Sequence, residues 1–172
     1  MPDSQKISEK QSEYMNLIAE IMDIRKRGEK PVAYIRTYGC QQNVADSEKI
    51  KGMLEQSGFE FSDEPDNADF ILFNTCAVRE HAEDRVFGNV GALKNLKRKH
   101  PQILIALCGC MMEQEHVANK IYKSFPFVGL VFGTHSLHHF PELMYNALLD
   151  GKRVFELSLI HISEPTRQEA IS

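Results

Sequence analysis

Hydrophobic positions in this chain fall into short apolar runs, separated by longer stretches with helical periodicity. The apolar runs are Val32 to Tyr38, Phe70 to Phe73, Ile103 to Leu107, Phe127 to Phe132 and Val154 to Leu157. Runs of this length with little polar interruption predict strands covered on both faces, as in a parallel sheet. Strand and helix alternate five times, which predicts an α/β fold with a flavodoxin-like, doubly wound parallel sheet of about five strands.

The segments that follow the first four predicted strands carry apolar residues at helical spacing. They run from a cap at Asn43 to about Gln56, from about Arg79 to Lys99, from about Met112 to Lys123, and from Pro141 to Leu149. Gly58 and Gly151 are good left-handed helix terminators. The acidic stretch from Ser62 to Asp69 contains a proline and is expected to be a solvated loop.

The first 30 residues form an N-terminal extension before the first predicted strand. Residues 1–10 are polar and are expected to be a disordered lead. The spacing of Tyr14, Leu17, Ile18 and Ile21 then predicts an amphipathic helix to about Arg27, stopped by glycine and proline. Its expected role is to cover part of the core, with partner binding as the alternative.

Composition places the chain among soluble globular proteins of about one domain. It has 172 residues, of which 42% are hydrophobic and 26% charged, and its net charge is −4. That charge gives no general attraction to nucleic acid. No apolar run approaches the roughly 18–20 residues that span a bilayer, and the polar start does not resemble a signal peptide. A cytoplasmic, monomeric protein is expected.

Three of the four cysteines follow predicted strands directly. Cys40, Cys76 and Cys110 come after the first, second and third apolar runs. The carboxyl ends of parallel strands lie on one edge of the sheet, where open α/β sheets bind their ligands. We therefore expect the three thiols to converge, and thiolates are ligands suited to iron–sulfur clusters and zinc.

Several kinds of thiol site compete at this point. A zinc site usually has paired C-x2-C spacings, which Cys40 and Cys76 lack. A redox-active dithiol usually has a C-x-x-C spacing, which this sequence lacks. A Cys–His catalytic pair would need His81, which on a helix would point away from Cys76. Three single cysteines suit a cubane cluster with one iron left for an outside ligand, and the alternative is that they are small buried hydrophobes.

The fourth cysteine, Cys108, stands two residues before Cys110. Gly109 is expected to turn the chain there, so that Cys110 reaches the cluster and Cys108 stays packed; a disulfide between the two would be awkward at a strand end. Gly39 and Gly109 suit backbone that passes close to a bulky inorganic group, or ordinary turn geometry.

Several motifs resemble one known family. They are Tyr38 to Asn43 (YGCQQN) with Asp46 to Glu48 (DSE), Asn74 to Glu80 (NTCAVRE), Gly109-Cys110, and Phe132 to Thr134 (FGT) with Leu137 to Pro141. Together they resemble the amino-terminal domain of the methylthiotransferases, a radical S-adenosylmethionine family. The resemblance covers about residues 31–157 and is closest to the branch that modifies transfer RNA at isopentenylated adenosine beside the anticodon.

The resemblance implies that Cys40, Cys76 and Cys110 bind an auxiliary [4Fe–4S] cluster that takes part in sulfur transfer. It implies transfer RNA and a sulfur donor as partners, and S-adenosylmethionine with a second cluster in a following barrel domain. We expect the flanking motif residues to shape the cluster loops: Gly39, Gln41, Asn43, Asn74, Thr75, Arg79 and Gly109.

The barrel of that family needs a C-x3-C-x2-C triplet, which this sequence lacks. The chain is therefore expected to be a fragment that holds the auxiliary cluster but is inactive alone. The string from Leu157 to Arg167 resembles a translated sequencing adapter, and we expect residues 158–172 to be a non-native tail. The alternative function is a non-enzymatic flavodoxin-like module that binds a nucleotide, a flavin or a partner protein, although no glycine-rich phosphate loop follows the first predicted strand.

Overall fold

A single parallel sheet organises the molecule. The computed structural model describes residues 2–77 and 81–157. The sheet has six strands in the order β2-β1-β3-β4-β5-β6, and all neighbours run parallel. The strands are β1 (Val32–Thr37), β2 (Glu60–Phe61), β3 (Phe70–Thr75), β4 (Leu104–Gly109), β5 (Leu130–Phe132) and β6 (Val154–Glu156). This confirms the predicted flavodoxin-like, doubly wound fold and adds a short edge strand, β2, that the sequence did not reveal.

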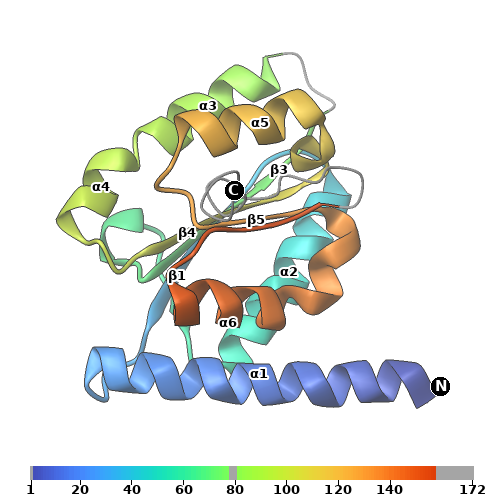
Figure 1. Cartoon of the computed structure of the whole chain (residues 1–172), viewed down its shortest axis with the longest axis vertical. Helices are drawn as coiled ribbons and strands as arrows, with labels where there is room; N and C mark the ends of the chain where they lie inside the picture. Colours follow the sequence, from blue (N-terminus) through green and yellow to red (C-terminus); the bar gives the residue numbers. More distant parts are fainter. Residues whose placement is uncertain (1, 78–80, 158–172) are drawn as a thin grey trace, which may run out of the picture.

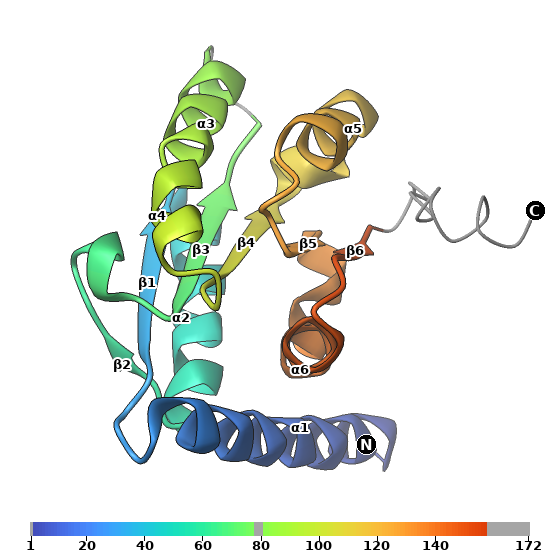
Figure 2. The same cartoon turned by 60° about the vertical axis from the view of Figure 1, so that its left-hand side comes forward.

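Helices cover both faces of the sheet (Figure 1). One face carries α2 (Gln41–Gln56) and α6 (Phe140–Asp150), with α1 (Pro2–Lys26) lying across them. The other face carries α3 (Ala82–Gly91), α4 (Lys94–Lys99) and α5 (Glu115–Ser124), as the second view also shows (Figure 2). Short 3-10 turns lie at η1 (Pro65–Asn67), η2 (Cys110–Glu113) and η3 (Thr134–His139).

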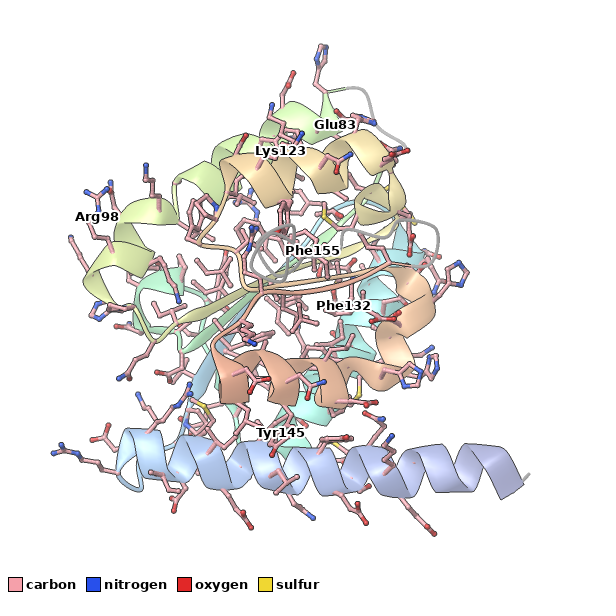
Figure 3. All side chains as sticks on the ribbon, in the orientation of Figure 1. Glu83, Arg98, Lys123, Phe132, Tyr145 and Phe155 are labelled. Atoms are coloured by element: carbon pink, nitrogen blue, oxygen red, sulfur yellow. The ribbon has the colours of Figure 1, made fainter. Side chains whose placement is uncertain are left out.

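Alternating residues of the central strands build two separate cores. Phe70 and Leu72 of β3 face α2 and α6, whereas Ile71 and Phe73 face α3 and α5. Every residue of β3 and β4 is buried, as expected for strands covered on both sides. Figure 3 shows Phe132 on the α6 side of the sheet, where its ring lies 5.5 Å from that of Phe140.

The expectation of a disordered lead over residues 1–10 is wrong. Helix α1 begins at Pro2 and is continuous to Lys26. Its later turns bury Met15, Ile18 and Met22 against the core, and this anchoring supports a helix that local composition alone would not predict. The role expected for it, covering part of the core, is confirmed.

Three helix boundaries also differ from the prediction. The helix expected over residues 79–99 is divided into α3 and α4, because glycines at 88 and 91 weaken the helix just before the break. Helix α2 begins at Gln41 with Cys40 as its N-cap, three residues before the N-cap expected at Asn43. The helix expected to start at Met112 begins only at Glu115, since η2 occupies the preceding residues.

Two further sequence predictions can be compared with the described residues. Across these residues, no helix is long and apolar enough to cross a membrane. The expected non-native tail, residues 158–172, lies outside the part of the chain that the structure describes.

Candidate functional site

Three cysteine loops lie side by side at the carboxyl edge of the sheet. Strands β1, β3 and β4 are neighbours, and Cys76 and Cys110 directly follow β3 and β4. Cys40 follows β1 and begins α2. All four cysteines are free thiols, so the disulfide considered from the sequence is not formed. Cys40 and Cys110 are exposed, whereas Cys76 and Cys108 are buried.

A buried pair of asparagines joins the Cys40 loop to the Cys76 loop. Asn43 Nδ2 donates to Asn74 Oδ1 at 3.0 Å and to the carbonyl oxygen of Thr75 at 2.9 Å. Asn74 Nδ2 returns a hydrogen bond to the carbonyl oxygen of Asn43 at 2.8 Å. Buried polar groups are retained when they are satisfied in this way, and here the pairing fixes the relative position of the two loops.

The Cys110 loop is tied to the same framework through Thr75. Its hydroxyl donates to the carbonyl oxygen of Cys108 at 2.6 Å. Beyond the strand, the backbone N–H of Ala77 donates to Cys110 Sγ at 3.4 Å. The residue after Cys76 therefore contacts the third thiol directly, and all three loops belong to one hydrogen-bonded unit.

Two glycines with positive φ allow these loops to pack together. Gly39 has φ +99°, and a methyl group there would lie 2.8 Å from Cys76 Sγ. Gly109 has φ +106°, and a methyl group there would lie 2.8 Å from the backbone nitrogen of Thr75. Both glycines lie against the neighbouring cysteine loop, and their close approach to an inorganic group stays a prediction.

Cys40 lies at the positive end of α2. The backbone N–H groups of Asn43 and Gln42 face its sulfur and lower the pKa of the thiol. Asn43 Oδ1 accepts from the backbone N–H of Cys40 at 3.4 Å, which completes a capping box. A thiol at a helix N-terminus is favoured as thiolate, the form that binds metal.

Cys108 is in the opposite environment. It is 3% exposed and packs in the core between the sheet and α6. Burial raises the pKa of the Cys108 thiol far above its ordinary value. Cys108 is packed, as predicted, and Cys110 beyond Gly109 is exposed; that Cys110 reaches a cluster stays a prediction.

Cys40, Cys76 and Cys110 are soft donors, the type that binds iron–sulfur clusters and zinc. Among residues 2–77 and 81–157, no three His, Cys, Asp or Glu side chains are gathered as ligands of one ion. In a cluster each thiolate binds a different iron, so the sulfur atoms are spread around the group. The three thiols stand at neighbouring strand ends, and N–H groups face the sulfurs of Cys40 and Cys110.

The remaining predicted residues are placed less centrally. Gln41 is exposed in the first turn of α2, and Arg79 lies outside the described residues. His81 is exposed and contacts Asp84 at 3.9 Å, in agreement with its interpretation as a solvent-facing histidine.

Sequence reasoning missed Arg36 and Arg85, which line a cavity beside Cys76. It also missed Asn89, whose side chain holds the hydroxyl of Tyr38 at 2.7 Å. The sequence offered one signal for them: Arg36 lies near the end of the predicted strand before Cys40, which places a cation at the carboxyl edge of the sheet.

Most of the chain is similar to known proteins. The family described as "Uncharacterized protein family UPF0004" matches residues 32–133. A protein of Clostridium perfringens (strain SM101 / Type A), named tRNA-2-methylthio-N(6)-dimethylallyladenosine synthase, is 48% identical over 136 residues, 79% of this chain and 30% of that protein. A protein of the same name from Caldicellulosiruptor saccharolyticus is 52% identical over 133 residues, 77% of this chain and 28% of that protein.

A third relative with the same name, from Clostridium botulinum (strain Alaska E43 / Type E3), is 46% identical over 140 residues. The match covers 81% of this chain and 31% of that protein. The chain thus spans less than a third of the length of the curated relatives that it matches.

Proposed function

This chain belongs to the UPF0004 family, and on that premise we propose that it is the cluster-binding part of a tRNA methylthiotransferase. The whole enzyme would add a 2-methylthio group to N6-isopentenyladenosine beside the anticodon, using S-adenosylmethionine. Residues 31–157 would form the domain that holds an auxiliary [4Fe–4S] cluster. The observation that carries the proposal is the hydrogen-bonded unit of three loops that presents Cys40, Cys76 and Cys110 at one sheet edge.

Each residue of this unit has a separate task in the proposal. Cys40, Cys76 and Cys110 would bind three irons of the cluster, and the fourth would be left open to carry or receive the sulfur that is transferred. The N–H groups at the start of α2 and at Ala77 would stabilise thiolate charge. Asn43 and Asn74 would keep the loops in register whether or not the cluster is bound.

The remaining support in the proposal comes from residues around the loops. Gly39 and Gly109 permit the close packing, and Thr75 ties the second loop to the third. Gln41 and Arg79 would complete the loops on the solvent side. Cys108 would stay packed and take no part in binding.

The same proposal assigns the remaining functions of the enzyme to parts outside this chain. The second cluster and the site that cleaves S-adenosylmethionine would belong to parts of the enzyme beyond this chain, so the chain alone would not turn over. Its substrate would be the anticodon region of transfer RNA, with a separate sulfur donor. We place the enzyme in the cytoplasm as a monomer.

Anaerobic reconstitution with iron and sulfide tests the proposal. The wild-type chain should bind about four irons, with the broad visible absorption of a thiolate-bound cluster. Cys40→Ala, Cys76→Ala and Cys110→Ala should each lose most of the iron. Cys108→Ala is the matched control and should retain it. Undiminished iron in all three site variants would exclude these thiols as ligands.

A further inference from the structure

A cavity of about 290 Å³ lies beside Cys76 at the carboxyl edge of the sheet. It lies between the end of β1 and the first turns of α3. Besides Cys76, its lining includes Arg36, Tyr38, Gly39, Ala82 and Arg85. None of these side chains except Cys76 has a place among the proposed cluster ligands.

Arg36 lies against the ring of Tyr38, and Arg85 lines the same cavity. The guanidinium carbon of Arg36 lies 4.9 Å from the centroid of that ring. The ring itself is fixed, since its hydroxyl accepts from Asn89 at 2.7 Å and its edge packs against Phe73.

Within the described part of the chain, neither Arg36 nor Arg85 has an ion-pair partner. The acidic residues in the first turn of α3 contact histidines instead: Glu83 lies 2.7 Å from His116, and Asp84 lies 3.9 Å from His81. Both arginines are exposed, so their donors are available to an outside ligand.

We propose that this cavity binds one phosphodiester group of an RNA strand through Arg36 and Arg85. The planar fork of arginine matches the oxygens of phosphate, and two forks at one cavity suit a single anion of that size. The choice of RNA rests on the proposed function, whereas a free phosphate ion has the same chemistry and must be distinguished from RNA by experiment. A strand held here would pass next to Cys76, and so beside the proposed cluster.

The test uses the 172-residue chain without its cluster, labelled with nitrogen-15. An RNA hairpin with a seven-nucleotide loop is titrated while the Nε resonances of the arginines are followed. We expect Arg36 and Arg85 to shift together. The double variant Arg36→Gln/Arg85→Gln should bind the hairpin about tenfold more weakly, with a shallower dependence of affinity on salt. The double variant Arg36→Lys/Arg85→Lys keeps both positive charges but lacks the planar guanidinium groups. It should bind the hairpin more tightly than the double glutamine variant and more weakly than the wild-type chain.

A matched control removes two positive charges elsewhere. Lys94→Gln/Arg98→Gln lies on α4, at the opposite end of the α3–α4 layer from Glu83 (Figure 3). This variant should change the affinity for the hairpin less than about twofold. An equal loss in both double variants, or no shift of the two arginines with RNA, would overturn the proposal.

Inorganic phosphate provides the second arm of the experiment. Phosphate that displaces the hairpin from Arg36 and Arg85 would support a shared site. Phosphate that shifts the two arginines when the hairpin does not would reveal a site for free anions and overturn the assignment to RNA. The iron content of the cysteine variants is measured separately, so failure of the RNA site and failure of the cluster proposal are distinguishable.

Discussion

At the residue scale, the structure places chemically identical thiols in contrasting surroundings. Cys40 is exposed at a helix N-terminus, where the N–H groups of Asn43 and Gln42 lower the pKa of its thiol. Cys108 is enclosed by the core, where burial raises the pKa of its thiol. Because the thiolate is the reactive form, these two residues should differ strongly in reactivity.

Alkylation of the metal-free chain checks this difference. The rate at which iodoacetamide modifies Cys40 should reach half of its maximum at a pH below about 8.5, the value for a free cysteine. The rate should fall only as the pH drops through the lowered pKa of the thiol. Cys108 should stay unmodified until denaturant is added. Peptide mapping by mass spectrometry gives both rates, and equal modification of the two thiols in the folded chain would contradict this account.

The residue scale also shows which site features a sequence can reveal. Cys40, Cys76 and Cys110 were predictable because each stands directly after an apolar run, and parallel topology then dictates a common edge. The pairing of Asn43 with Asn74 was not predictable, since it depends on how two loops distant in sequence pack together. For the same reason, the position of Arg85 beside Arg36 became visible only in the folded chain.

At the element scale, the turns between strand and helix determine how closely the cysteine loops approach. Gly39, Gly58 and Gly109 all have positive φ, between +91° and +106°. A methyl group at Gly58 would meet open space, whereas one at Gly39 or Gly109 would meet the adjacent loop. Gly58 is therefore a matched control that separates backbone strain from loss of loop packing.

Alanine substitutions at these three glycines should give unequal losses of stability. Gly58→Ala should lower the free energy of unfolding by about 1 kcal/mol, the cost of a left-handed conformation with a side chain. Gly39→Ala and Gly109→Ala should each lower it by about 3 kcal/mol, since overpacking adds to that strain. Urea denaturation measures all three, and equal losses would mean that the loops do not constrain one another.

Element boundaries were less predictable than element types. Phe70 to Phe73 and Ile103 to Leu107 identified the central strands because complete burial leaves an uninterrupted apolar run. The two-residue strand β2 carries no such signal, since both of its residues are exposed. Hydrophobic periodicity also continues across the break between α3 and α4, so the pattern could not locate it.

At the scale of the whole molecule, α1 holds α6 at both ends. Gln11 Oε1 accepts from the backbone N–H of Glu142 at the start of α6, and Arg25 donates to the carbonyl oxygen of Leu148 near its end. Between these points Ile18 is buried, and Tyr145 of α6 points toward α1 (Figure 3), with its ring 5.4 Å from that of Tyr14. Helix α1 therefore contributes to the fold beyond the segment that defines the family.

Deletion of residues 2–26 should lower the free energy of unfolding by about 3 to 5 kcal/mol, because buried side chains on α1 would lose their apolar contacts. Ile24→Ala is the control, because it removes an apolar side chain of α1 that is 77% exposed. It should change the free energy of unfolding by less than about 0.5 kcal/mol. Urea denaturation of the two variants measures the difference. An unchanged midpoint after deletion would show that α1 is an independent arm.

The central claim for the whole molecule is that three strand ends hold one iron–sulfur group. Anomalous X-ray scattering at the iron absorption edge, from crystals of the anaerobically reconstituted chain, tests it most directly. We expect iron at the carboxyl edge of the sheet, bonded to the sulfur atoms of Cys40, Cys76 and Cys110 and remote from Cys108. Iron located elsewhere, or bonded to Cys108 in place of any of the three, would contradict it.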